Sequence, residues 1–163
     1  MKTIFAAVAL SLVALPSVAQ DIEVREAFAR ATLPNAPVAG GYLTVANHGD
    51  RDDRLTGARA DFAGEAQIHE MTHSGDVMRM RELPDGVAIP AGQEVHLSTG
   101  SNHLMFMRLN RGLVQGDTVT VTLTFEKAGD IDVPFIVGPI NARSFDDDGS
   151  GRTAPADHGG HSH

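Results

Sequence analysis

The sequence contains no cysteine and no tryptophan, and it has only one tyrosine among its 163 residues. Without cysteine, the chain forms no disulfide and offers no thiolate to a metal. This excludes cysteine-based structural zinc sites, iron–sulfur clusters and the cysteine-ligated blue-copper centre of electron-transfer cupredoxins. We also expect no lipoprotein-type lipid anchor, because the acceptor cysteine is missing. Any metal site must therefore use other donors.

Long apolar runs are equally scarce, and the clearest one occupies residues 4–15. Lys2 precedes it, and Pro16 and the small residues 17–19 follow it. This order predicts a secretory signal peptide over residues 1–19, cleaved near Ala19. The run is shorter than the roughly 20 residues that span a bilayer. We expect a soluble, exported protein without membrane insertion, in the periplasm because the signal is of the bacterial type.

Basic residues are few, since 13 Lys and Arg face 21 Asp and Glu, for a formal net charge of −8. An acidic chain is a poor partner for nucleic acid or for anionic lipid. The length remaining after the signal is enough to bury one hydrophobic core and too short for two domains of ordinary size. We expect a monomer with a single folded domain over residues 20–143.

Turn-forming residues recur through this region at a spacing typical of an all-β sandwich or barrel. Residues 118–125 alternate strictly between threonine and apolar residues, which predicts a strand with one buried face. Residues 131–137 are its expected hairpin partner, with Pro134 favouring a sheet edge. Further strands are expected at 42–46, 65–72, 77–82, 94–97 and 103–109, whereas 24–32 suits either a strand or a helix.

The composition changes over residues 144–163, which are rich in Asp, Gly and Ser and have almost nothing apolar after Phe145. This composition predicts a disordered tail. The tail ends with His158, His161 and His163, a histidine tract typical of metal binding. Imidazole nitrogens suit Cu(II), so these residues are candidate Cu(II) ligands.

Methionine and histidine gather in one part of the chain. The five methionines beyond the initiator are Met71, Met78, Met80, Met105 and Met107, and His69, His73 and His103 accompany them. Thioethers with imidazoles, and no thiolate, match the ligand preference of Cu(I) better than that of Zn(II), Mg(II) or Ca(II). The alternative is that methionine fills the core, and this is the interpretation we prefer for Met78 and Met107.

Strand geometry brings some of these donors onto a common face. In a strand, His103 and Met105 point to the same side with Cα atoms roughly 6.6 Å apart. The same relation holds for His69 with Met71 and for Met78 with Met80. We predict a metal site formed by His69, Met80, His103 and Met105. Met71 and His73 are candidate auxiliary ligands, and we expect His48 and His96 to be structural or solvated.

The same segments resemble a known family. The sequences at 69–71, 78–81, 89–92 and 103–107 are similar to those of the PCuAC periplasmic copper chaperones. That family carries a histidine, ten intervening residues, a methionine, about 21 further residues, and then His-x-Met. Here ten residues separate His69 from Met80, and 22 separate Met80 from His103. We expect a loop to absorb the additional residue. Further likeness lies at Pro37, Gly41, Tyr42, Asn47, Asp53, Leu55, Gly116, Asp117 and residues 124–129.

The resemblance implies a cupredoxin-like Greek-key barrel or sandwich that binds one Cu(I) through His69, Met80, His103 and Met105. It also implies delivery of copper towards the CuA site of cytochrome c oxidase, alongside a Sco-type thiol protein. Some members carry a C-terminal extension that takes Cu(II), which the tail here resembles. The alternative function is a copper storage or resistance protein that sequesters the metal.

One motif favours an enzyme instead. Residues 69–73 spell His-Glu-x-x-His, the pattern of zinc metalloproteases. That chemistry requires a helix, which brings both histidines to one metal ion. In a strand, His69 and His73 would stand about 13 Å apart. Since turn residues follow directly at 74–76, we expect a strand and no catalytic activity, whereas a helix across 66–78 would favour the protease.

Overall fold

The computed structural model describes residues 21–75 and 77–147 of the chain. The predicted signal peptide and the tail histidines His158, His161 and His163 lie outside the described residues. Within the described ranges, no helix is long and apolar enough to cross a membrane.

The described residues form ten β-strands and one short 3-10 helix, which confirms the all-β prediction. The elements are β1 (Ile22–Arg30), β2 (Val38–Asn47), β3 (Asp53–Ala60), β4 (Ala63–Ser74), β5 (Val77–Glu82), β6 (Val87–Ile89), β7 (Glu94–Leu97), β8 (His103–Leu109), β9 (Thr118–Phe125), β10 (Gly129–Gly138) and η1 (Phe145–Asp147). Four strands, β5, β7, β8 and β9, have the bounds expected from sequence. The ambiguous segment 24–32 is largely strand, as part of β1.

Two strands were not predicted. β3 contains an internal glycine and three arginine or aspartate side chains, which obscure its alternation, and β6 is only three residues long. Both strands are held by a neighbour that is distant in sequence: β3 pairs with β9, and β6 pairs with β3. Their strand conformation therefore follows from tertiary pairing more than from local pattern.

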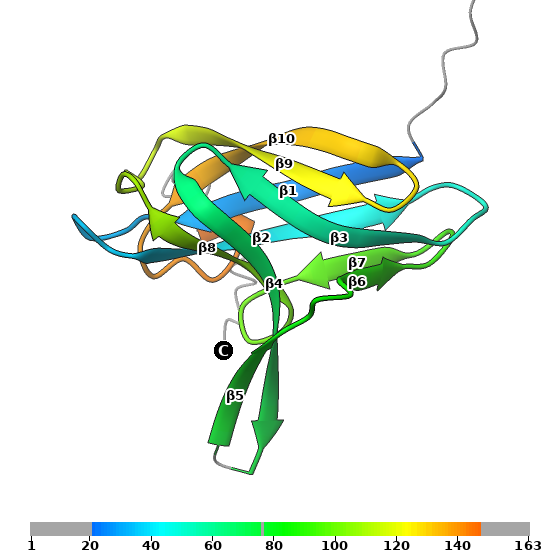
Figure 1. Cartoon of the computed structure of the whole chain (residues 1–163), viewed down its shortest axis with the longest axis horizontal. Helices are drawn as coiled ribbons and strands as arrows, with labels where there is room; N and C mark the ends of the chain where they lie inside the picture. Colours follow the sequence, from blue (N-terminus) through cyan, green and yellow to red (C-terminus); the bar gives the residue numbers. More distant parts are fainter. Residues whose placement is uncertain (1–20, 76, 148–163) are drawn as a thin grey trace, which may run out of the picture.

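The strands form one sheet in the order β5-β4-β8-β2-β1-β10-β9-β3-β6, with β7 paired to β2 (Figure 1). Neighbours are antiparallel except β1 and β10, which are parallel. The path ends at β5 on one side and β6 on the other, so the sheet is a folded-over sandwich that does not close into a complete barrel. This is the cupredoxin-like architecture expected from the resemblance.

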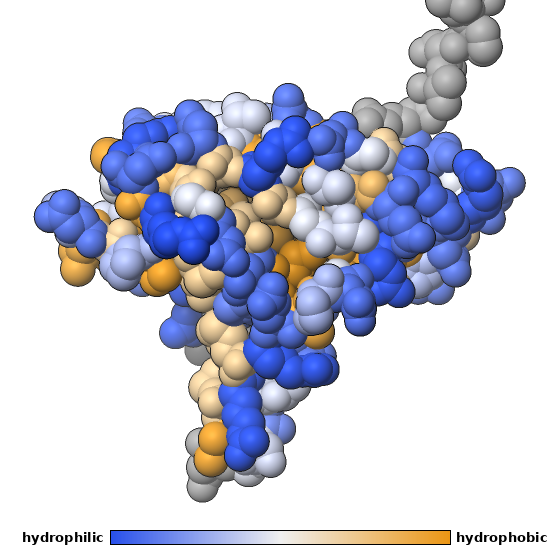
Figure 2. All heavy atoms as spheres, in the orientation of Figure 1, coloured by the Kyte–Doolittle hydropathy of each residue, from blue (hydrophilic) through white to orange (hydrophobic). Residues whose placement is uncertain are grey.

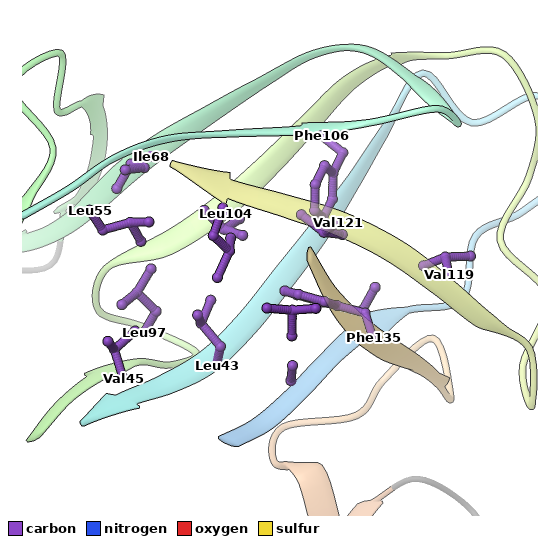
Figure 3. Close-up of a cluster of buried hydrophobic side chains, with 14 of the residues drawn as sticks. Leu43, Val45, Leu55, Ile68, Leu97, Leu104, Phe106, Val119, Val121 and Phe135 are labelled. Carbon is purple, nitrogen blue, oxygen red and sulfur yellow. The ribbon is translucent and has the colours of Figure 1, made fainter. Parts of the chain in front are cut away.

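The core lies between the two halves of the folded sheet. Leu43 of β2, Leu104 of β8 and Phe135 of β10 point into the same interior (Figure 3). The Phe106 ring is central, with centroids 5.0 Å from Phe62 and 6.4 Å from Phe135. In β9 every apolar residue is buried and the threonines are exposed or half-buried, so the predicted alternation is confirmed.

Pro134 was expected at a sheet edge, yet β10 has a neighbour on each side. All of β9 pairs with residues 129–136 of β10, whereas β1 pairs only with residues 136–138 of β10. Pro134 precedes the β1 pairing and is exposed, so it occupies a local edge where a missing N–H breaks no ladder bond.

The chain remains packed beyond the predicted domain end at residue 143. Phe145 of η1 packs on a small cluster formed by Phe28, Tyr42 and Ala142. The described fold thus extends at least into the first residues of the segment expected to be a tail.

The β4–β5 hairpin projects away from the sandwich (Figure 1). β4 pairs with β8 from Ala63 to His69, and with β5 from His69 to Ser74. His69 therefore marks the point where β4 leaves the body of the protein. All six residues of β5 are exposed, so this hairpin is held by its ladder and turn and not by burial in the core.

Candidate metal centre

Two histidines face each other at the base of the projecting hairpin. His69 of β4 is the direct cross-strand partner of His103 of β8. Their ring centroids are 5.9 Å apart with an interplanar angle of 71°. His103 is only 3% exposed, and the Tyr42 ring lies beside it at 6.2 Å. Arg30 in turn lies over the Tyr42 ring at 5.0 Å. Tyr42, itself covered by Arg30, therefore packs against the His103 ring and restricts its position.

Hydrogen bonds define which nitrogen of each ring is free. His103 Nδ1 lies 3.0 Å from the Ser101 carbonyl oxygen. A carbonyl oxygen only accepts, so Nδ1 carries the proton and Nε2 keeps its lone pair. His69 Nε2 lies 2.7 Å from Gln67 Oε1, and it donates for the same reason. The lone pair of His69 is therefore on Nδ1.

His69 Nδ1 is buried and has no hydrogen-bond partner; it is the one buried side-chain nitrogen or oxygen of this kind within residues 21–75 and 77–147. An unsatisfied buried polar atom costs about 1–3 kcal/mol, so such atoms are rare and call for an explanation. A metal ion is the kind of partner that satisfies a lone pair on a neutral imidazole.

Gln67 and Glu65 support this arrangement, and sequence reasoning did not find them. The Gln67 amide nitrogen donates to Glu65 Oε1 at 2.7 Å, which directs the amide oxygen towards His69. The two residues precede His69 by two and four positions and so share its strand face. That spacing is the only sequence signal for their role. Histidine ligands of metals commonly donate their second N–H to such an acceptor.

The environment favours the neutral form of His69. Burial lowers its pKa below the ordinary value of 6.5, the nearby His103 imidazole lowers it further, and Glu82 partly opposes both effects. A histidine must be deprotonated to bind a metal. The local field therefore keeps His69 in its metal-binding form to lower pH than a free imidazole.

The methionines lie on the same face as the histidines. Met105 is the cross-strand partner of Gln67, and Met80 is the partner of Met71. A pocket of about 480 Å³ is lined by His103 and by four methionines, namely Met71, Met78, Met80 and Met105. Three of the four predicted ligands thus line one pocket, and His69 joins them through its contact with His103.

None of the five methionines in the described part of the chain belongs to either hydrophobic core cluster. Met78 is 59% exposed and Met80 is 46% exposed. The prediction that Met78 fills the core is therefore wrong: the hairpin that carries it leaves the sandwich, so no core reaches it. Met107 is half-buried and lies outside the clusters as well.

Nitrogen and oxygen donors alone do not complete a site here. Within the described ranges, no group of three or more His, Asp or Glu side chains is arranged to hold a metal ion. The further soft donors beside His69 and His103 in these ranges are the methionine thioethers of the pocket. The His-Glu-x-x-His motif lies on strand β4 and not on a helix, so the geometry that a zinc protease needs is absent from residues 69–73.

His48 and His96 make surface contacts, as expected. His48 Nε2 lies 2.8 Å from Glu23 Oε2. His96 Nδ1 lies 3.0 Å from the Thr44 hydroxyl, and its Nε2 lies 3.3 Å from Glu94 Oε1.

Comparison with known sequences identifies a protein family that this chain matches. A family model described as "Putative lipoprotein LpqE-like" matches residues 22–137. A curated relative, "Putative lipoprotein Lxx21020" of Leifsonia xyli subsp. xyli, is 33% identical over 107 residues, which are 66% of this chain and 63% of the relative. The match thus spans less than two thirds of that relative's length.

Solved structures give the same fold. The copper-bound PCuAC domain from PmoF2 is 26% identical with a TM-score of 0.60, and 72% of this chain aligns with 92% of that one. The apo form of that domain has a TM-score of 0.64 at the same identity, over 76% of this chain and 94% of that one. The Cu(I) form of DR1885 from Deinococcus radiodurans is 29% identical with a TM-score of 0.59, over 78% and 85%.

Proposed function

Because the chain belongs to the LpqE-like family and has the fold of PCuAC domains, we propose that it is an exported copper chaperone. It binds Cu(I) through His69, Met80, His103 and Met105 and passes the ion to a copper-accepting protein. The folded unit begins near residue 20 and includes Phe145, which packs on it, and it is released into the periplasm after cleavage of residues 1–19.

The observation that carries the proposal is the pair of prepared imidazoles. His69 and His103 each donate one ring N–H to an oxygen, which leaves one lone pair on each of two rings whose centroids are 5.9 Å apart. The lone pair of His69 is buried without a partner. Copper supplies that partner, and the thioethers of the adjoining pocket complete its coordination.

The donor set suits Cu(I) in particular. Thioethers are soft ligands and select Cu(I) over Mg(II) and Ca(II). They carry no proton, so binding does not require their deprotonation. The lowered pKa of His69 extends this advantage to mildly acidic conditions. Solved PCuAC structures that contain copper support the choice of metal.

The position of the site supports delivery. Met80 lies on the exposed β5 strand, where an incoming protein reaches it without unfolding the core. Neutral donors on a surface hairpin can be exchanged one at a time, as transfer requires. The proposed recipient is a copper-accepting protein such as the CuA subunit of cytochrome c oxidase or a Sco-type thiol protein.

Loss of Met105 tests the ligand set. In the full chain loaded anaerobically with one equivalent of Cu(I), X-ray absorption is expected to show mixed sulfur and nitrogen scattering. Met105→Ala is expected to lose part of the sulfur shell, because a thioether leaves the copper. Met107→Ala is the matched control, since Met107 lies on the same strand but does not line the pocket. It should leave the spectrum unchanged. A shell of nitrogen and oxygen only, unaffected by Met105→Ala, would refute the His/Met site.

A second part of the proposal concerns His158, His161 and His163, which lie outside the described residues. They capture Cu(II), which prefers nitrogen donors. A one-electron donor outside this chain reduces the ion to Cu(I), which then passes to the core site. Replacing all three by alanine in the full chain is expected to remove the nitrogen-ligated Cu(II) signal from electron paramagnetic resonance spectra while Cu(I) binding persists. Unchanged Cu(II) uptake would contradict this role.

Storage is the second candidate function, and exposed methionines on the hairpin are compatible with it. The two functions differ in a deletion strain. Loss of oxidase assembly indicates delivery, whereas copper sensitivity with an intact oxidase indicates storage.

A further inference from the structure

The β4–β5 hairpin carries soft donors beyond the four already assigned. Met71 pairs with Met80, and one step further out His73 pairs with Met78. Alternate residues of a strand share a face, so Met71 and His73 lie on the same side as His69. The hairpin therefore presents a ladder of thioethers and an imidazole that begins at the His69–His103 pair and runs towards the hairpin tip.

The outer donors have no structural role that would explain them. Met78 is 59% exposed, and neither it nor Met71 belongs to a core cluster. His73 is exposed, and no hydrogen bond or ion pair joins its side chain to another described residue. Exposing the apolar side chain of methionine to water is unfavourable. Figure 2 shows that the hairpin bears hydrophobic surface along its length and at its tip. Large apolar side chains that gather on a surface mark a site of interaction.

The spacing of these residues suits one ion. Directly opposed residues of antiparallel strands have Cβ atoms about 4.5–5.5 Å apart, and successive residues on one face follow at roughly 6.6–6.8 Å. Met71, His73 and Met78 occupy adjoining positions of this kind, and methionine is long and flexible. Met71 and Met78 also line the pocket that contains His103 and Met105, so the outer donors open onto the same space as the inner ones.

We propose that Met71, His73 and Met78 form a second Cu(I) site on the outer half of the hairpin. The inference rests on the proposed function, because the outer site exchanges copper with the inner one. Met80 lies opposite Met71 and next to both sites, so it is the ligand through which the ion passes. Each step forms one copper–thioether or copper–imidazole bond and breaks another. Copper remains Cu(I), so no electron donor or acceptor is required.

The outer site binds more weakly than the inner one. It offers three donors on an exposed hairpin, whereas the inner site offers four, including the buried His103. Copper therefore fills the inner site first, and the outer site is the point where an ion enters or leaves. A weak outer site next to a tighter inner one gives fast exchange with a partner without lowering the final affinity.

The test follows the methionine methyl groups by NMR in the full chain, labelled with 13C at the methionine methyl and titrated anaerobically with Cu(I). The first equivalent is expected to shift the methyl signals of Met80 and Met105, and the second those of Met71 and Met78. The double variant His73→Ala with Met78→Leu should lose the second step at Met71 and keep the first. Met107→Leu is the control and should keep both steps.

The outcomes separate this inference from the proposed function. A first step that moves neither Met80 nor Met105 refutes the inner site. If the inner site fills normally but a second equivalent moves no hairpin methionine, copper has bound elsewhere and the outer site is refuted. A single step that moves all four methyl signals together also refutes it, because the hairpin then forms one shared site.

Discussion

Replacement of His103 by alanine is expected to weaken Cu(I) binding by more than about 100-fold. Loss of a residue that only orients a ligand typically costs 10–100-fold in metal affinity, and His103 is proposed as a ligand itself. Its ring is 3% exposed and is positioned by the Ser101 carbonyl and by Tyr42. Competition against a chromophoric Cu(I) chelator measures the loss.

Two variants guard against an indirect effect of misfolding. His103→Asn keeps a side-chain N–H that can donate to the Ser101 carbonyl but removes the imidazole lone pair, so it should fold and still lose affinity. His96→Ala removes an exposed imidazole of β7 that does not line the pocket, and this variant should bind Cu(I) normally. If His103→Asn retains the full affinity, His103 is not a ligand.

Replacement of Asp53 by alanine is expected to destabilise the fold by about 3 kcal/mol, because three partly buried N–H groups lose their acceptor and a lost acceptor costs about 1–3 kcal/mol. Asp53 is 8% exposed. Its Oδ1 accepts from the backbone N–H groups of Arg54 at 2.7 Å and Lys127 at 2.9 Å. Its Oδ2 accepts from the N–H of Ala128 at 2.9 Å. One carboxylate thus ties the start of β3 to the β9–β10 turn. Urea unfolding measures the change.

Asp50→Ala is the matched control. The Asp50 side chain is 97% exposed, and its one ion pair, with Arg51, is 4.0 Å long, so its loss should change stability by less than about 0.5 kcal/mol. Asp53→Asn should remain destabilised, because its amide nitrogen cannot accept from the Ala128 N–H. Equal stability of the Asp53→Ala and Asp50→Ala variants would show that the carboxylate does not anchor the turn. At low denaturant, copper affinity should be unchanged in both, since Asp53 does not line the metal pocket.

The strand predictions had their clearest basis in β9, where apolar and polar residues alternate, and they missed β3 and β6. The pattern of β9 places one face in the core and one in water, and this local signal was sufficient for its bounds. β3 and β6 lack such a signal and are defined by partners far along the chain. The prediction that Met78 fills the core was wrong because the alternation of side chains along β5 does not show whether other residues pack against that face.

The amino-acid composition and the strand patterns were enough to establish which metal donors this protein has. The absence of cysteine removes thiolate, and the run from His69 to Met107 supplies soft thioethers and imidazoles at alternate positions of predicted strands. The tertiary structure decided how these donors meet. It set His69 opposite His103, left His69 Nδ1 without a partner and carried β5 away from the sandwich. The physical reason is that side-chain alternation is a property of one strand, whereas cross-strand partners and burial depend on pairing between distant segments.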